Sequence, residues 1–325
     1  MDNFIKHIEI CNFKSVKYLK LIDCRRINLF IGYPNVGKSN LIEALGLFSL
    51  PFLAEGDSLN KLVRAEHANE LFYNAKESYF SVSANKRKIT AFIDEDCIRY
   101  EDESFNFSSQ LVLQSIVYGI ERLKSNIKRY VFQANNRWQS SGKTCLTPPY
   151  GENLIDVISR NTNLLEFKTW LKKELSKYGL EYVLDKTTGS IKVQRRIENE
   201  EVMQLPFSSI ADTLQRIIFY KTAIASNTDS ILLFEEPEAH AFPPYIRTIT
   251  ADIAASRSNQ FFIATHSPVI VNEFLEDAEI RRELAVYIID FRNGETTARH
   301  LTDAELEQCY ADGIDLFFDI ERYLD

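Results

Sequence analysis

The residues best suited to chemistry in this 325-residue sequence lie in one short loop, GYPNVGKSN. The loop fits the phosphate-binding pattern G-x-x-x-x-G-K-[ST]. Backbone N–H groups of such a turn cradle a β-phosphate, while Lys38 would reach the β- and γ-phosphates and Ser39 would bind Mg²⁺. The residues expected to line a bound nucleotide are Gly32, Tyr33, Pro34, Asn35, Val36, Gly37, Lys38, Ser39 and Asn40.

The segments on either side of the loop decide whether it is more than a chance glycine turn. Ile27–Ile31 reads INLFI, an apolar run typical of a buried strand. After the loop, apolar residues recur at the spacing of one helix face, namely Leu41, Ala44, Leu45 and Phe48. A strand before the loop and a helix after it are the context that a phosphate-binding loop requires.

Two later apolar runs each lead to a polar residue of chemical interest. Ile231–Phe234 predicts a strand, and ligands of open parallel sheets bind beyond the carboxyl ends of strands. There Glu235 would bind Mg²⁺ directly or through water, and Glu236 would orient the attacking water and accept its proton. Phe261–Ala264 predicts a further strand, after which His266 would contact the γ-phosphate. Singly these are ordinary strand-end residues; their order behind a complete loop makes Lys38, Glu236 and His266 the expected catalytic set.

The order of these motifs resembles the ABC-type ATPases of the RecF, SMC and OLD group. The likeness lies in the strings HIEICNFKSVKYLKL, GKSNLIEAL, LLFEEPEAH and FFIATHSP, and it covers residues 1–50 and about 205–275. The string EEPEAH is most similar to OLD-type and standalone bacterial ATPases, which are often found in anti-phage defence operons. The resemblance implies ATP and Mg²⁺ as cofactors. It also implies an α/β P-loop NTPase fold with a mixed central sheet, flanking helices and an antiparallel β-lobe.

A GTPase is the other reading of the loop, because P-N-V-G-K-S also occurs in small GTP-binding domains. Such domains read guanine through N-K-x-D and sense the γ-phosphate through D-x-x-G. The sequence has NKLV at Asn60 and NKRK at Asn85, neither with the aspartate, and it contains no D-x-x-G. ATP is therefore the expected nucleotide.

The resemblance also implies a homodimer or higher homo-oligomer joined through the ATP sites. The group carries a signature such as L-S-G-G-Q, which completes the ATP site of the partner subunit. Here the stretch reads LPFSSIADTLQRIIFY, without a glycine, and the resemblance gives the signature role to Ser209. Locally, Ser209 and Asp212 predict a capping box that starts a helix with an apolar face of Ile210, Leu214, Ile217 and Ile218. Asp212 would repel a phosphate, so the contact with a partner's ATP stays open.

Two further features of the group cannot be assigned with one reading to residues of this sequence. Its magnesium-sensing glutamine could be Gln133, Gln139 or Gln194, and no spacing selects one. Glu238 and His240 fall where the group has an inter-subunit loop, although a plain surface turn fits them equally well.

We expect residues 1–325 to form one ABC-type head with three parts. Residues 1–105 carry the loop and the β-lobe, to which the alternating pattern of 78–100 contributes antiparallel strands. Residues 106–180 predict a helical insertion, too short for a coiled-coil arm. Residues 181–325 carry the acidic strand, two strands around Asn293-Gly294 and a terminal acidic helix that begins near Asp303.

Composition limits the location and the partners. The net charge is −8, the five cysteines are scattered without a C-x-x-C pair, and no apolar run approaches the length of a membrane span. These features, with no signal-peptide core at the N-terminus, favour a cytoplasmic protein that does not enter membranes. A DNA-binding surface is a second candidate, carried by the basic residues Arg122, Lys124, Lys128, Arg129, Lys172, Lys173, Lys177, Arg195 and Arg196. Interleaved acids favour a solvated face instead.

The function that these observations favour is an ATP-hydrolysing switch that controls a separate effector, such as a nuclease or toxin. Too few residues follow Ser267 for the nuclease domain of OLD proteins. A RecF-like DNA-binding ATPase of DNA maintenance is the alternative. A scaffold that binds ATP without turnover is a third reading, against which the pair Glu235 and Glu236 argues.

Overall fold

The computed structural model describes residues 4–54, 56–93, 97–101, 106–110, 124–134, 141–161, 164–185, 190–197 and 201–324. The chain divides into two compact units. The core unit comprises residues 1–129, 229–236 and 258–325. The inserted unit comprises residues 130–228 and 237–257.

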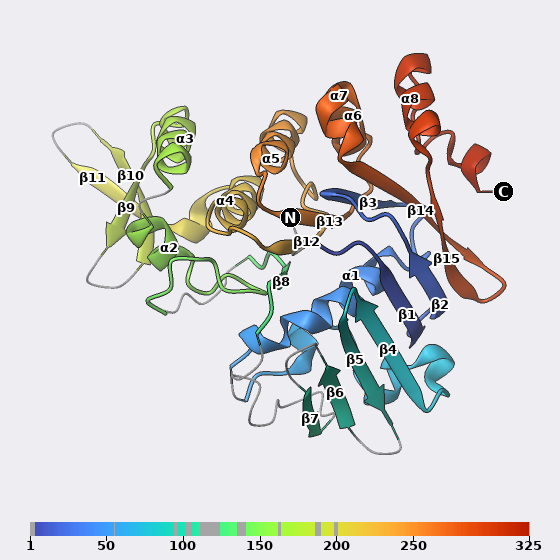
Figure 1. The fold of residues 1–325 in the computed structure, drawn as a ribbon. Helices are drawn as coiled ribbons and strands as arrows, with labels where there is room; N and C mark the ends of the chain where they lie inside the picture. Colours follow the sequence, from blue (N-terminus) through green and yellow to red (C-terminus); the bar gives the residue numbers. More distant parts are fainter. Residues whose placement is uncertain are drawn as a thin grey trace. The chain divides into compact units, whose positions relative to one another are not determined.

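A mixed sheet forms the centre of the core unit, with the strand order β15-β14-β3-β13-β12-β8 (Figure 1). Its strands are β3 Ile27–Ile31, β8 Ile127–Tyr130, β12 Ile231–Glu235, β13 Gln260–Ala264, β14 Leu284–Arg292 and β15 Glu295–His300. β14, β3, β13 and β12 are mutually parallel, and β15 is antiparallel. β3 and β13 are buried along their whole length, as expected of apolar runs covered on both faces.

An antiparallel sheet, the expected β-lobe, has the order β2-β1-β4-β5-β6-β7. Its strands are β1 Ile8–Phe13, β2 Val16–Leu21, β4 Tyr79–Ala84, β5 Arg87–Phe92, β6 Cys97–Glu101 and β7 Asn106–Gln110. The hairpin pattern of 78–100 is thereby confirmed. The expected start of a helix near 107 is wrong, because β7 instead pairs with β6 and continues the sheet, drawn in dark teal in Figure 1.

Helix α1, Lys38–Gly46, contacts both sheets of the core unit. It packs on β12 and β13 of the mixed sheet and on β1 and β4 of the β-lobe. The apolar face expected from the sequence is fully buried, and Phe48 continues it into the 3₁₀ helix η1, Leu47–Phe52. Because α1 starts directly after the phosphate-binding loop, this packing fixes the loop against both sheets.

The remainder of the core unit consists of short helices and a C-terminal hairpin. The helices are η2 Leu59–Lys61, η3 Ala68–Leu71, η4 Tyr73–Ala75, α6 Pro268–Glu276, α7 Ala278–Arg282, α8 Asp303–Asp312 and η8 Ile320–Tyr323. The hairpin of β14 and β15 turns at Asn293-Gly294, as predicted. The terminal helix is shorter than expected, because Gly313 adopts a left-handed φ of 64° and ends α8.

Helices and a small sheet make up the inserted unit. Its elements are α2 Leu154–Arg160, α3 Leu165–Ser176, β9 Glu181–Asp185, β10 Ser190–Arg196, β11 Val202–Pro206, η7 Phe207–Ser209, α4 Asp212–Ala225 and α5 Pro243–Ala255. The strands form an antiparallel sheet in the order β11-β10-β9. Of the helical pattern expected over 106–180, α2 and α3 are found, whereas 127–130 is strand β8 with a buried Ile127 and Tyr130. Residues 111–123 lie outside the described part of the chain.

Candidate functional site

The loop between β3 and α1 can be built only with glycine at its two ends. Gly32 has a φ of +151°, and a Cβ there would lie 2.1 Å from the carbonyl oxygen of Ile289. Gly37 has a φ of +105°, and a Cβ there would lie 2.2 Å from Oγ1 of Thr296. Side chains at either position would collide with β14 or β15, so the glycines of the motif are explained by close approach as well as by φ.

Polar side chains that the sequence did not point to hold this loop in place. Thr296 Oγ1 donates to the carbonyl oxygen of Val36 at 2.9 Å and lies 2.7 Å from Oγ of Ser15. Asn40 Nδ2 donates to the same Ser15 Oγ at 2.6 Å. Ser15 and Thr296 carry no motif in the sequence, so only the fold reveals them. Asn40, expected to line the nucleotide, holds the loop to the β1–β2 turn.

Lys38 is buried against its own loop, with 5% of its surface exposed. Its Nζ donates to the carbonyl oxygens of Gly32 at 2.9 Å and Tyr33 at 2.7 Å. Burial lowers the pKa of Lys38 to about 8, and the negative charge of Glu236 opposes that shift. The amine is therefore close enough to Glu236 to sense its charge, although the two residues are far apart in sequence.

Glu236 follows β12 in an uncommon backbone conformation. Its φ is 43°, a left-handed value that costs energy for a residue with a side chain. Its N–H donates to the carbonyl oxygen of Ala264 at 2.8 Å, which fastens it to the end of β13. Its Oε1 lies 3.6 Å from Nε2 of His266, and burial and then the charge of Lys38 lower the pKa of that imidazole. The fold thus brings Lys38, Glu236 and His266 together at the carboxyl edge of the sheet.

Ser39 and Glu235, the two expected metal ligands, are hydrogen-bonded to each other. Both offer hard oxygen donors of the kind that Mg²⁺ prefers, with Ser39 in the first turn of α1 and Glu235 at the end of β12, so the residues fit such an ion. Among the described residues, no three His, Cys, Asp or Glu side chains cluster as a metal site of their own. A magnesium ion here would therefore rely on one carboxylate, one hydroxyl, nucleotide oxygens and water.

A charge cluster, buried except for Arg64, surrounds Glu235, and the sequence did not predict it. Arg64 and Arg129 each donate to Glu235, and Arg64 Nε also donates to Oε1 of Glu43 at 2.6 Å. Glu43 is fully buried in α1 and pairs with Lys14 on its other oxygen. Arg129 had been grouped with the basic surface residues. That grouping is wrong, because its side chain is 5% exposed and is enclosed beside Glu235 and Leu62.

The expected capping box at Ser209 is not formed. Helix α4 begins at Asp212 with Ala211 as its N-cap and without a side-chain cap, while Ser209 lies in the turn η7. Gln215 explains the difference, because its Nε2 donates back to the carbonyl oxygen of Ile210 at 2.7 Å and fixes the turn. The expected burial of Leu214, Ile217 and Ile218 in α4 is confirmed.

His240 lies beside Asp212 within the inserted unit. Its Nδ1 is 3.8 Å from Oδ2 of Asp212, and its carbonyl oxygen accepts a 2.6 Å hydrogen bond from Thr213.

Of the candidate sensing glutamines, Gln194 donates to Glu181 at 3.2 Å on the small sheet, and Gln139 lies outside the described residues. Arg122 of the basic set lies outside them too.

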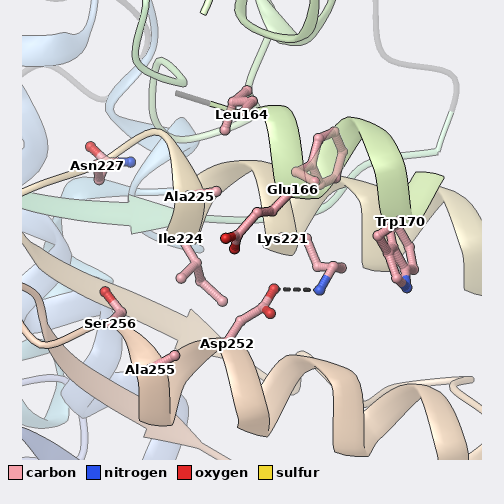
Figure 2. Close-up of a pocket in the computed structure, with 11 residues that line it drawn as sticks. Leu164, Glu166, Trp170, Lys221, Ile224, Ala225, Asn227, Asp252, Ala255 and Ser256 are labelled. Atoms are coloured by element: carbon pink, nitrogen blue, oxygen red, sulfur yellow. Dashed lines mark hydrogen bonds and ion pairs between the residues drawn. The ribbon is translucent and has the colours of Figure 1, made fainter. Parts of the chain in front are cut away.

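A hollow of about 450 Å³ in the inserted unit lies among α3, α4 and α5. Lys221 and Asp252 face each other across it at 2.5 Å, and the Lys221 amine lies 4.7 Å from the ring centroid of Trp170 (Figure 2). The lysine side chain is only 7% exposed. The carboxylate of Asp252 and the face of the Trp170 ring stabilise its charge in place of water. We interpret the pair as a structural tie between α4 and α5.

Comparison with known proteins shows the fold. No protein-family profile matches the chain. An SMC head bound to the C-winged helix domain of ScpA superposes with a TM-score of 0.51 at 15% identity, covering 92% of this chain and 98% of that one. An SMC head with an extended coiled coil, bound to the C-terminal domain of ScpA derived from Pyrococcus furiosus, gives 0.51 at 13% identity over 98% and 99%. The chain therefore has the α/β fold of these SMC heads, as its motifs predicted.

One curated relative is similar in sequence over a short stretch. The DNA replication and repair protein RecF of Caldanaerobacter subterraneus subsp. tengcongensis is 37% identical over 70 residues. That stretch covers 22% of this chain and 19% of the relative. As to membranes, none of the helices in the described ranges is both long and apolar enough to cross one.

Proposed function

We propose that this protein binds ATP with Mg²⁺ at the loop Gly32–Asn40, hydrolyses it, and uses the cycle as a switch that controls a separate effector. The observation that carries the proposal is the grouping of Lys38, Glu236 and His266 at one sheet edge beside that loop. The fold shared with SMC heads supports an ATP cycle as the use of this edge.

Each residue has a distinct task in this proposal. Lys38 leaves the loop carbonyls and neutralises β- and γ-phosphate charge, while the loop N–H groups cradle the β-phosphate. Glu236 orients the attacking water and takes its proton, and His266 contacts the γ-phosphate beside it. Mg²⁺ held by Ser39 and Glu235 would supply further neutralisation of the phosphate oxygens.

The switch would act through assembly of two or more copies in the cytoplasm. Ser209 of one copy would reach the ATP of the next, from the turn η7 that precedes α4. Asp212, whose carboxylate would repel a phosphate, starts the helix that follows that turn. A nuclease or toxin in anti-phage defence is the effector class that the EEPEAH string favours.

A RecF-like role on DNA is the second candidate, and the 37% identity to RecF over 70 residues favours it. Binding to DNA would then depend steeply on salt, since each phosphate contact releases counterions. Lack of DNA binding at low salt would remove this candidate.

The test of the switch is nucleotide-dependent assembly of Glu236→Gln, measured by light scattering with ATP, ADP or GTP. We expect ATP with Mg²⁺ to produce a larger species that GTP and ADP do not, and Ser209→Ala to reduce it. Ser256→Ala, a serine elsewhere in the inserted unit, serves as the matched control. An unchanged size with ATP bound would contradict the switch, and tighter binding of GTP than of ATP would contradict the nucleotide assignment.

A further inference from the structure

Both carboxylate oxygens of Glu235 accept hydrogen bonds from arginines. Arg64 Nη2 lies 3.0 Å from Oε1, and Arg129 Nη2 lies 3.0 Å from Oε2. A magnesium ion would need one of these oxygens as its ligand. The arginines therefore occupy the positions that the metal would use.

The two arginines differ in how firmly the fold holds them. The Arg129 side chain is 5% exposed, and it also donates to the carbonyl oxygen of Leu62. It packs so closely on α1 that a Cβ at Gly46 would come within 2.7 Å of its Cδ. The Arg64 side chain is 62% exposed and is held by Glu43 and Glu235. Arg129 is thus enclosed by its surroundings, whereas Arg64 can swing into solvent.

The balance of charges around Glu235 gives the reason why Arg64 would leave this carboxylate when a metal ion binds. The cluster contains three cations, Lys14, Arg64 and Arg129, and two carboxylates, Glu43 and Glu235. A divalent cation added at Glu235 would meet this excess of positive charge at short range. Removing Arg64 to solvent lowers that repulsion and frees Oε1, and the side chain is already largely solvated.

We propose that Arg64 is an internal counter-ion of Glu235 that competes with Mg²⁺ and leaves the carboxylate when metal and nucleotide bind. Arg129 stays on the other oxygen and keeps Glu235 in place. Arg64 is therefore a positioning residue. Its ion pair with Glu235 sets the Mg²⁺ concentration at which the metal site fills. The inference rests on the proposed function, since it takes Ser39 and Glu235 as the metal ligands.

The experiment measures binding of a fluorescent ATP analogue over a series from excess EDTA to saturating Mg²⁺. It compares wild type, Arg64→Gln, Arg64→Lys and Arg322→Gln. Arg322 is the matched control, because its side chain is 64% exposed and pairs with Asp319 at 3.0 Å. We expect Arg64→Gln to need about two- to fivefold less Mg²⁺ for half-maximal tightening, the range of an exposed ion pair. Arg64→Lys should lie between it and wild type, and Arg322→Gln should match wild type.

Two results would overturn the inference. One is an unchanged or raised Mg²⁺ requirement in Arg64→Gln. The other is a large loss of affinity in EDTA, which would mean that Arg64 binds phosphate itself. If wild type binds no nucleotide at all, the proposed function fails, and Mn²⁺ binding without nucleotide, followed by electron paramagnetic resonance, decides the inference. Tighter Mn²⁺ binding by Arg64→Gln than by wild type would support it, and equal binding would overturn it.

Discussion

Oε1 of Glu236 lies 3.6 Å from Nε2 of His266, across the carboxyl ends of two adjacent parallel strands. The contact depends on the backbone, because the N–H of Glu236 bonds to Ala264 and turns the residue into a left-handed φ of 43°. The negative charge of Glu236 favours the protonated imidazole, against the burial and the Lys38 charge that lower the pKa of His266. The relationship makes specific predictions for both side chains.

His266 should shape the acidic limb of the pH profile of ATP turnover. Burial and then Lys38 hold its pKa below the ordinary 6.5, so the imidazole is neutral at neutral pH and leaves Glu236 available as a base. As pH falls through that lowered pKa, His266 becomes charged and pairs with Glu236, which is then occupied by the imidazolium instead of the attacking water. We expect His266→Gln to turn over ATP about tenfold more slowly and to move the acidic limb to lower pH. An unmoved limb would mean that His266 does not act on Glu236.

Lys38 should take up a proton when nucleotide binds at alkaline pH. Its pKa of about 8 in the free protein leaves the amine largely neutral at about pH 9, and bound phosphates raise that pKa. Calorimetry in buffers of different ionisation enthalpy should therefore detect uptake at about pH 9 and almost none at about pH 6.5. Lys38→Arg is the control, because a guanidinium stays charged throughout. Equal uptake by both proteins would assign the proton to another group.

Substitution of Gly32 should destabilise the protein more than substitution of a glycine that is required only because its φ is positive. Gly32→Ala would force a Cβ to within 2.1 Å of the Ile289 carbonyl oxygen, whereas Gly313→Ala, at a φ of +64°, meets nothing within 4 Å. We expect Gly313→Ala to lower the free energy of unfolding by about 1 kcal/mol and Gly32→Ala by about 2–4 kcal/mol. Thermal unfolding checks this, and equal losses would show that the loop relaxes away from β14.

The pair Lys221–Asp252 should stabilise the inserted unit. Asp252→Asn would leave a lysine that is 7% exposed without its carboxylate, at a cost of about 1–3 kcal/mol, since Asp252 itself is partly solvated. The double variant Lys221→Met with Asp252→Leu should recover most of the loss. Arg160→Gln, which removes a 55% exposed arginine lying 3.7 Å from Asp156, should cost less than about 0.5 kcal/mol. Thermal or denaturant unfolding of the four proteins measures these differences, and a harmless Asp252→Asn would contradict the structural role.

The sequence predicted the parts of the site that depend on short runs of consecutive residues. The loop, the flanking strand Ile27–Ile31 and the strand ends at Glu235 and His266 are local patterns, and the fold of ATPase heads follows from their order. Ser15, Thr296 and Arg64 were missed because they reach the loop or Glu235 only through tertiary packing. Arg129 was read as a surface cation, since charge in a sequence does not reveal burial.

Helix and strand were confused where periodicity is weak. The run after Asn106 pairs as β7 because a neighbouring edge, β6, is available to it, and that edge is invisible in the local pattern. The capping box at Ser209 failed for a similar reason. Gln215 reaches back to Ile210 and fixes a turn that places the helix start at Asp212.

ATP turnover with Mg²⁺ by wild type and Glu236→Gln tests the central claim most directly. Release of inorganic phosphate and binding of the nucleotide are measured on the same samples, with Glu276→Gln, an exposed residue at the end of α6, as the control. The account predicts that Glu236→Gln binds ATP as tightly as wild type but releases phosphate about 10²- to 10³-fold more slowly, because it lacks the base beside the loop. Turnover that survives in Glu236→Gln, or wild type that binds ATP without releasing phosphate, would contradict it.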